Sequence, residues 1–348
     1  GRHVEPEVLG RMTDAMAHRG PDGEGTFVDG NVGLGHRRLS LIDLAGGHQP
    51  MLNEDGSVVV VFNGEIYNFE ALSRDLVRQG HRFKTRSDTE TLVHLFEQHG
   101  TGMFSMLRGM FAFALFDRRR RELYLVRDRY GIKPVYYHEQ GGSLRFASEV
   151  KSLMAAGYSV DVNPHAVHAY LQTRFAHGDE TIFRGVYRLA EGHYLRWCDG
   201  HSQQAAYYSN PAHDSTQAPA EVEQVFEHAL TDAVASHMIA DVPVGAYLSA
   251  GVDSSVLVSE MVRRTRQPVR TFCVDFAGSN GSSEAPAAEE TARHLGCDHT
   301  TVTCGVEQLL ELPAVVRTLE EPVGDAIVVA QYCLSRATHE AGIKTVLT

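Results

Sequence analysis

The stretch 244–262 limits what this chain can fold into more than any other part of the sequence. It opens with an apolar run, closes that run with small residues, and then repeats apolar residues at a spacing of about 3.6. This change of period predicts a strand, a tight loop and a helix. Small residues in the loop let the backbone approach a ligand, and serine hydroxyls with free amides at the helix start favour an anion.

The loop itself, Leu248-Ser-Ala-Gly-Val-Asp-Ser-Ser255, lacks the Gly-Lys-Ser/Thr ending of a Walker A motif. It resembles the Ser-Gly-Gly-x-Asp-Ser pyrophosphate loop of enzymes that cleave ATP to AMP and pyrophosphate. Ala250 stands where those enzymes usually have a second glycine. The competing interpretation is an ordinary strand-to-helix loop that binds no phosphate.

Length and charge set the broad class. A chain of 348 residues suggests two domains, each large enough for its own core. The net charge of −12 argues against nucleic-acid partners and acidic membranes. No apolar run reaches the roughly 18 residues of a membrane helix, and no signal peptide opens the sequence. Five cysteines without C-x-x-C spacing predict reduced thiols, so we expect a cytoplasmic protein.

Two regions of different fold class follow one another. Up to residue 208, helices mix with antiparallel strands, including a predicted hairpin of 111–117 with 122–128, which indicates an α+β fold. Beyond it, helices alternate with strands, which indicates an α/β fold with a parallel sheet. The polar stretch 209–219 separates them. We therefore expect a first domain at 1–208, a linker at 209–219 and a second domain at 220–348.

Polar residues near predicted strand ends suggest a pocket in the first domain. Ser87 is expected to cap a helix, with Glu90 completing a capping box. The plain alternatives are a simple turn at Asn63-Gly64 and a helix cap at Asp88. As a pocket, an arginine would pair with an α-carboxylate, a carboxylate with an α-ammonium, and an amide with an oxyanion. The candidates are Arg38, Asn63, Gly64, Glu65 and Asp88.

Five motifs of the first domain occur in order: Arg19-Gly-Pro-Asp22, Arg38-Leu-Ser-Leu-Ile42, Asn63-Gly-Glu-Ile-Tyr-Asn68, Ser87-Asp-Thr-Glu90 and Arg127-Asp-Arg-x-Gly-x-Lys-Pro134. They resemble the glutaminase domain of class II glutamine amidotransferases. Together with the pyrophosphate loop and the domain order, they make nearly the whole chain resemble the glutamine-hydrolysing asparagine synthetase family. The resemblance implies an N-terminal-nucleophile-type αββα sandwich, followed by a parallel-sheet ATP-pyrophosphatase domain of the adenine nucleotide α-hydrolase-like kind.

The resemblance also implies roles for individual residues. Arg38 would bind the glutamine carboxylate, Asp88 its amino group, and Asn63 with Gly64 would form the catalytic oxyanion hole. The whole glutamine site would comprise Arg38, Leu39, Ser40, Leu41, Ile42, Asn63, Gly64, Glu65 and Asp88. ATP and Mg2+ are the implied cofactors, with Asp253 as the metal ligand. The ATP site would comprise Leu248, Ser249, Gly251, Asp253, Ser254, Ser255 and Val274.

The implied reaction is the ATP-dependent amidation of aspartate to asparagine through an acyl-adenylate, releasing AMP, pyrophosphate and glutamate. Its partners would be small molecules, with a homodimer suggested by the family. That family has an N-terminal Cys-Gly as nucleophile, whereas no cysteine here precedes Cys198. It also continues into Gly-Glu-Gly-x-Asp-Glu, whereas this sequence stops at Leu347-Thr348. We therefore expect a fragment, incomplete at both ends.

Three alternatives stay open. In the first alternative, the acceptor is a carboxylate other than aspartate, in natural-product or polysaccharide biosynthesis. Alternatively, the protein resembles a β-lactam synthetase, an adenylating cyclase that has no glutaminase activity. In the last alternative, both sites are inactive and the protein is a binding module. The retained Arg38, Asn63 and Asp88 favour the amidotransferase.

Overall fold

The computed structural model describes residues 3–159, 161–176, 178–211, 219–278, 283–325 and 327–348. The chain divides into two compact units. The first comprises Gly1–Pro211 with Glu320–Pro322, and the second comprises Ala212–Leu319 with Val323–Thr348. Most of the predicted linker, residues 212–218, lies outside the described residues.

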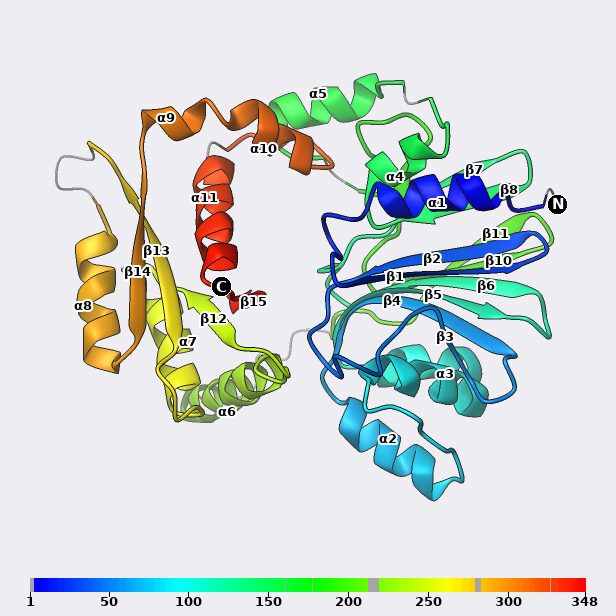
Figure 1. The fold of residues 1–348 in the computed structure, drawn as a ribbon, viewed down its shortest axis with the longest axis horizontal. Helices are drawn as coiled ribbons and strands as arrows, with labels where there is room; N and C mark the ends of the chain where they lie inside the picture. The colour runs from blue at the N-terminus through cyan, green and yellow to red at the C-terminus, as the bar shows by residue number, and fades with distance from the viewer. Residues whose placement is uncertain (1–2, 160, 177, 212–218, 279–282, 326) are drawn as a thin grey trace. The chain divides into compact units, whose positions relative to one another are not determined.

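Antiparallel sheets form the first unit (Figure 1). Its strands are β1 (Gly23–Asp29), β2 (Val32–Arg38), β3 (Met51–Leu52), β4 (Val58–Ile66), β5 (Gly109–Asp117), β6 (Glu122–Arg127), β7 (Tyr136–Gln140), β8 (Ser143–Ala147), β9 (Tyr187–Arg188), β10 (His193–Cys198) and β11 (His201–Ala206). Its helices are α1 (Pro6–Asp14), α2 (Phe69–Arg78), α3 (Asp88–His99), α4 (Val150–Ala155), α5 (Pro164–Thr173) and the 3-10 helix η1 (Gly100–Met106). Within the described residues, the central sheet has the order β11-β10-β6-β5-β4-β3, and the smaller sheets are β1-β2 and β8-β7-β9.

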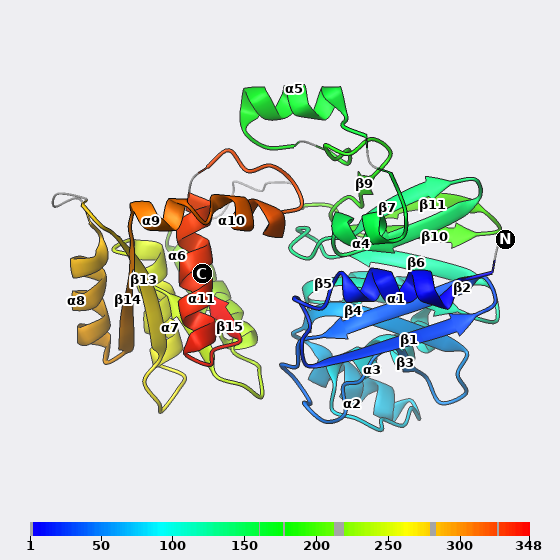
Figure 2. The same cartoon turned by 45° about the horizontal axis from the view of Figure 1, so that its top comes forward.

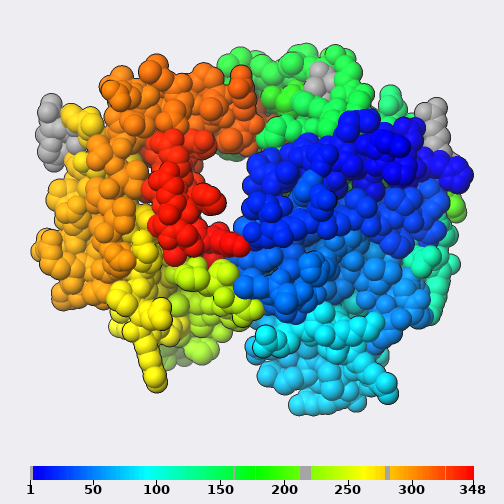
Figure 3. Space-filling model, viewed as in Figure 1, coloured from blue at the N-terminus to red at the C-terminus, as the bar shows by residue number. Residues whose placement is uncertain are grey.

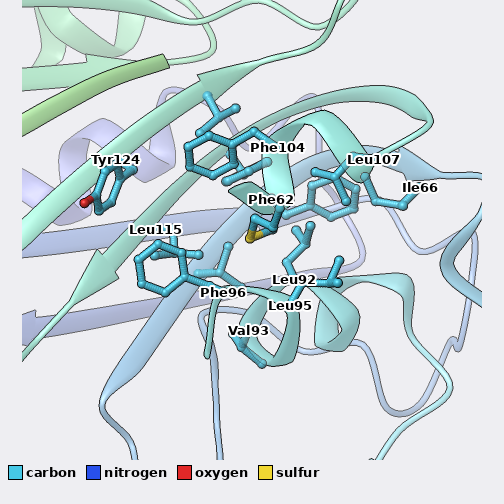
Figure 4. Close-up of a cluster of buried hydrophobic side chains, with 14 of the residues drawn as sticks. Phe62, Ile66, Leu92, Val93, Leu95, Phe96, Phe104, Leu107, Leu115 and Tyr124 are labelled. Carbon is cyan, nitrogen blue, oxygen red and sulfur yellow. The ribbon is translucent and has the colours of Figure 1, made fainter. Parts of the chain in front are cut away.

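Two apolar clusters on opposite faces of the central sheet explain the layers of this unit. On one face, Phe62 and Leu115 pack against Leu92 of α3 (Figure 4). On the other face, the alternate residues Val59 and Val61 pack against side chains of β2 and β7. A further cluster joins β7 to α4 and α1. The resulting order of helix, sheet, sheet and helix confirms the predicted αββα sandwich.

Glycines let helix α1 lie directly on β2. A Cβ atom on Gly35 would lie 2.3 Å from Cγ2 of Thr13 and 3.2 Å from Cδ1 of Leu9. The Thr13 hydroxyl bonds to the carbonyls of Leu9 and Gly10, which fixes its side chain. In Figure 3 the dark blue N-terminal residues lie at the surface of this unit, above the lighter blue and cyan residues that follow them in the chain.

The second unit confirms the α/β prediction (Figure 2). Its strands are β12 (Val244–Tyr247), β13 (Arg270–Phe276), β14 (Asp298–Cys304) and β15 (Thr345–Leu347), and its helices are α6 (Pro219–His237), α7 (Val252–Val262), α8 (Ala285–Leu295), α9 (Val306–Leu309), α10 (Leu312–Thr318) and α11 (Ile327–Glu340). The strands are parallel, in the order β14-β13-β12-β15. Helices α6, α7 and α8 cover one face, with Met261 and Ala288 packed around Ala246, while Leu334 of α11 packs on Phe272 of the other face.

One plain alternative and one local expectation are wrong. The Asn63-Gly64 pair makes no turn, because β4 runs on through it to Ile66. The capping box is also incomplete: the Ser87 hydroxyl does accept from the amide of Thr89 at 3.3 Å, but Glu90 turns elsewhere. Its carboxylate accepts from the amides of Lys84 and Thr85, at 2.8 and 2.6 Å, because the turn before the helix presents both donors.

The contact between α1 and β2 generates a stability prediction. Replacing Gly35 by Ala places a methyl group against fixed side chains of α1, and overpacking of this kind costs about 1 to 3 kcal/mol. Urea unfolding followed by the fluorescence of Trp197, the only tryptophan, reports on this unit because Trp197 lies in β10. Gly10→Ala is the matched control, since nothing lies within 4 Å of its Cβ position. Equal stability of the two variants would contradict the proposed packing.

Candidate functional site

The amide groups at the end of β4 point alternately to its two sides. The amide of Phe62 donates to Oε1 of Gln49 at 2.6 Å, and the amide of Ile66 donates to Oδ2 of Asp88 at 3.0 Å. Because backbone groups alternate along a strand, the amide of Gly64 points to the same edge, between these two acceptors. A main-chain donor is therefore directed out of the sheet at Gly64.

Asn63 and Gly64 together offer two donors. The side-chain nitrogen of Asn63 is buried and has no hydrogen-bond partner among the described residues. Gly64 has φ of 147°, and a Cβ atom there would lie 2.1 Å from the carbonyl oxygen of Met110. Only glycine fits this strand position. An amide side chain next to an outward main-chain N–H is the donor pair that stabilises an oxyanion.

Two carboxyl groups lie beside these donors with little access to water. Asp88 is 4% exposed and is the first residue of α3 rather than its cap. Burial raises the pKa of Asp88, against the amides of Ile66 and Thr89, which lower it. Burial and then the charge of Asp88 raise the pKa of Glu65, and Lys133 opposes that shift. The pair therefore retains a proton at a pH where free carboxylates are ionised, and a ligand ammonium would offset its charge.

Arg38 is buried at the end of β2 and shapes the loop that follows. Its Nη1 donates to the carbonyl of Leu44 at 3.1 Å, and its Nη2 to those of Ile42 and Asp43 at 3.1 and 2.7 Å. The carboxylate of Asp43 in turn accepts from the amide of Arg86 at 2.9 Å. The predicted glutamine loop is thus tied to the segment that leads into Asp88.

The four residues after Arg38 are placed by the same loop. The amide of Ser40 donates to Oδ2 of Asp22 at 2.8 Å, which ties the motif around Asp22 to this loop. Leu39 is 39% exposed, and Leu41 and Ile42 are partly buried. The structure therefore brings the first two motifs together through a main-chain contact.

Two residues of this region were not predicted from the sequence. Gln49 joins β4 to α3, because its carbonyl accepts from Phe62 and its nitrogen donates to Oγ1 of Thr89 at 3.4 Å. Nothing in the sequence around Gln49 marks it. The charge of Lys133 acts to lower the pKa of Glu65. Burial, and then the charge of Arg19, lower the pKa of Lys133 itself. Lys133 belongs to the motif at 127–134, which is the feature of the sequence that could have identified it.

That motif builds the turn which delivers Lys133. Asp128 is fully buried, and its two oxygens accept from four amides, those of Phe111, Tyr130, Ile132 and Lys133. Arg127 donates to the carbonyls of Gly131 and Lys133 at 2.7 and 3.0 Å. The side chains of Arg127 and Asp128 therefore have a structural role, because they hold the turn that places Lys133 near Glu65.

In the second unit, the small-residue loop lies at the carboxyl end of β12. This strand lies between β13 and β15, so the strand order reverses there, and ligands of such sheets bind at this point. The Ser249 hydroxyl accepts from the amide of Gly251 at 3.1 Å and lies 3.0 Å from that of Ser254, while Ser255 donates to the carbonyl of Gly251 at 2.8 Å. Asp253 is exposed in the first turn of α7.

These residues have the donor types that pyrophosphate and Mg2+ require. Hydroxyls and amides at the start of an eleven-residue helix suit phosphate oxygens, and an exposed carboxylate suits Mg2+. The side chains of Leu248 and Val274, the two apolar residues of the predicted ATP site, lie on different faces of the sheet. Leu248 packs in the cluster under α7, whereas Val274 packs against the opposite face of the sheet. Their side chains therefore do not line one pocket.

Comparison with known families agrees with this geometry. Residues 1–208 match the glutamine amidotransferase domain, and residues 225–348 match asparagine synthase. The chain therefore belongs to the glutamine amidotransferase family, with an asparagine synthase domain following. The resemblance inferred from the five motifs and the loop is confirmed.

The relatives share about a third of their residues with this chain. A glutamine-hydrolyzing asparagine synthetase 1 of Bacillus subtilis is 36% identical over 335 residues, which cover 95% of this chain and 52% of the relative. Amidase chyE of Penicillium rubens is 35% identical, over 100% of this chain and 54% of its own. The chain thus spans about half the length of these relatives. No helix in the described part of the chain is long and apolar enough to cross a membrane.

The raised pKa of Glu65 generates a pH prediction. In the unfolded chain Glu65 has its ordinary pKa of 4.5 and loses its proton above that pH, whereas in the folded protein it keeps the proton. The free energy of unfolding therefore falls as the pH rises above 4.5. Glu65→Gln removes this penalty. We expect the variant to be more stable than the wild type by about 1 to 3 kcal/mol at pH 8, with the gain fading toward pH 4.

Unfolding of both proteins across this pH range, followed by Trp197 fluorescence, measures the difference. Glu139→Gln is the matched control, because Glu139 is an exposed carboxylate on β7 of the same unit. A gain for Glu65→Gln that is equally large at pH 4 and pH 8 would contradict the assignment.

Proposed function

We propose that this protein transfers nitrogen from glutamine to a carboxylate that it first activates with ATP, and that the carboxylate is aspartate. The products are asparagine, glutamate, AMP and pyrophosphate. The observation that carries the proposal is the side-chain nitrogen of Asn63, which has no partner among the described residues, beside the outward N–H of Gly64 on the edge where Asp88 lies. A phosphate-type loop at the switch point of a second, parallel sheet supports the synthetase half.

In the first half-reaction, Asp88 holds the glutamine ammonium and Arg38 its carboxylate. An arginine has five N–H donors, so its bonds to three loop carbonyls leave capacity for a carboxylate. A thiolate attacks the amide, and we assign that role to the N-terminal cysteine of the family, which is not among these residues. The donors of Asn63 and Gly64 stabilise the resulting oxyanion, by about 3 kcal/mol. Collapse of this adduct breaks the C–N bond and releases ammonia, and water then hydrolyses the thioester to glutamate and the free thiol.

In the second half-reaction, Ser249, Gly251 and Ser254 hold the phosphates of ATP, and Asp253 holds Mg2+, which supplies charge neutralisation when bound. The hydroxyls that now bond within the loop exchange those partners for phosphate oxygens. The dipole of α7 adds a favourable field. The carboxylate displaces pyrophosphate, and ammonia from the first half-reaction then displaces AMP.

The oxyanion assignment is tested by Asn63→Ala in the full-length protein, which includes the N-terminal cysteine assigned above. Loss of one such donor lowers kcat by about 100- to 1,000-fold, so glutamate release should fall by that factor while the Michaelis constant for glutamine changes little. Asn31→Ala, in the exposed turn between β1 and β2, is the control. Unchanged glutamate release in Asn63→Ala would refute the role. A wild type that turns over ATP without releasing glutamate would instead favour the cyclase alternative.

The metal assignment is tested by Asp253→Asn. We expect ATP-dependent pyrophosphate release to fall by about 100-fold or more while glutaminase activity persists, since the two sites belong to different units. Asp298→Asn is the control, because this exposed carboxylate pairs with Arg270 at the amino end of its strand. If pyrophosphate release survives in Asp253→Asn, another group holds the metal.

A second acceptor class has specific support. Relatives named amidases match this chain as fully as the asparagine synthetases do, including one at 35% identity over 100% of this chain. Pyrophosphate release measured with aspartate and with a panel of other carboxylic acids separates the two. Stimulation by aspartate alone supports asparagine formation, and stimulation only by another acid replaces aspartate as the acceptor.

A further inference from the structure

A cluster of metal-ligating side chains lies at the far end of α3 from Asp88. Among the residues that the structure describes, His81, His94 and Glu97 offer ligand atoms that all lie within 4.8 Å of one another. His81 belongs to the segment between α2 and α3, and the other two residues to α3. We propose that this cluster is a structural binding site for a zinc-like divalent ion, separate from either half-reaction.

The hydrogen bonds of His81 direct a lone pair toward the cluster. Its Nε2 lies 3.2 Å from Oε1 of Gln98, an acceptor, and we assign the proton of the neutral ring to Nε2 on that ground. Its Nδ1 is therefore unprotonated in the neutral ring and lies 3.7 Å from Oε2 of Glu97. Two acceptor atoms face each other across a gap that a cation would fill.

His94 is buried, and it also presents an unprotonated ring nitrogen to a carboxylate oxygen. Its side chain is 1% exposed, and carboxylates face both ring nitrogens: Nδ1 lies 3.2 Å from Oε2 of Glu97, and Nε2 lies 3.6 Å from Oε1 of Glu90. Its Nε2 has no hydrogen-bond partner among the described residues. A neutral imidazole has one N–H, so it leaves a lone pair against one carboxylate. A cation on Nδ1 removes the conflict and lets Nε2–H point at Glu90, as metal-bound histidines commonly do.

The spacing and the donor types suit zinc. Ligands at zinc bond lengths lie about 3.3 Å apart in a tetrahedron, close to the separations of 3.2 and 3.7 Å here. Oε2 of Glu54, 3.6 Å from Nδ1 of His94, is placed to be the fourth ligand. Two imidazoles with two carboxylates favour zinc over Mg2+ or Ca2+, which prefer oxygen alone.

The surroundings hold these ligands in place and leave an entry. Asn53 donates to Oε1 of Glu97 at 2.7 Å, and the ring of Phe83 lies 4.6 Å from that of His94. Glu54 and Glu97 are 39% and 26% exposed, so an ion reaches the site from solvent. Binding would join the turn after β3, the segment before α3 and α3 itself. Because that segment leads into Ser87 and Asp88, the ion would stabilise the frame of the glutamine pocket without touching it.

The test measures metal binding directly. The untagged protein is stripped with EDTA, titrated with Zn2+ by calorimetry, and loaded with Co2+ to record the visible bands of a tetrahedral site. We expect one Zn2+ per chain, and at least about 100-fold weaker binding for His81→Gln and Glu97→Gln, since even outer-shell changes cost 10- to 100-fold. His99→Gln, at the exposed end of the same helix, should bind as the wild type does.

Two results would overturn the proposal. One is the absence of binding at micromolar Zn2+, with a nitrogen NMR signal showing that His94 is a charged imidazolium instead. The other is binding that His81→Gln and Glu97→Gln leave unchanged, which would place the ion elsewhere. Glu97→Gln is isosteric, His81 is 15% exposed, and circular dichroism verifies that both variants fold. Neither readout depends on glutaminase or synthetase activity, so the outcome is independent of the proposed function.

Discussion

Strand β4 is the element on which the first unit depends. Its apolar residues alternate between the two cores of the sandwich, so the strand is buried on both faces. This burial fixes the register of its polar end, where Gly64 pairs with Phe111 and where Asn63 and Glu65 extend on the face of Val61. A slip of one residue would move Asn63 and Glu65 to the other face. The core thus positions the donors and carboxyl groups of the site.

The sequence was sufficient for the fold class and for the elements with strong apolar patterns. β5 and β6 were predicted as a hairpin, and β12 with α7 from the change of period in 244–262. β1 was not predicted, because Gly23–Asp29 has few apolar residues and its extended form comes from pairing with β2. The side chain of Glu90 was predicted wrongly, because two amides of the preceding turn compete for it. Local patterns identify elements, but tertiary contacts decide these details.

In the candidate site, too, local motifs identified some residues, and others depend on tertiary contacts. Motifs separated by many residues indicated Arg38, Asn63, Gly64 and Asp88 without any structure. Gln49 was not found, because its role is to bridge β4 and α3, and a bridge has no local pattern. The histidine and glutamate cluster was missed for the same reason, since Glu54, His81 and His94 come from three segments. Burial also shifts pKa values in a way that composition does not reveal, as the raised pKa values of Glu65 and Asp88 illustrate.

The strand order of the second unit has a consequence for synthesis on the ribosome. The described strands of the first unit have all emerged once residue 206 has been made, so this sandwich can begin to fold early. The parallel sheet is different, because β15 supplies one neighbour of β12 and comes last among the described strands. Strand β12, which leads into the phosphate loop, therefore leaves the exit tunnel well before β15 and has an open edge until β15 follows. Chaperones would meet the nascent protein during that interval, when β12 presents an unpaired flank.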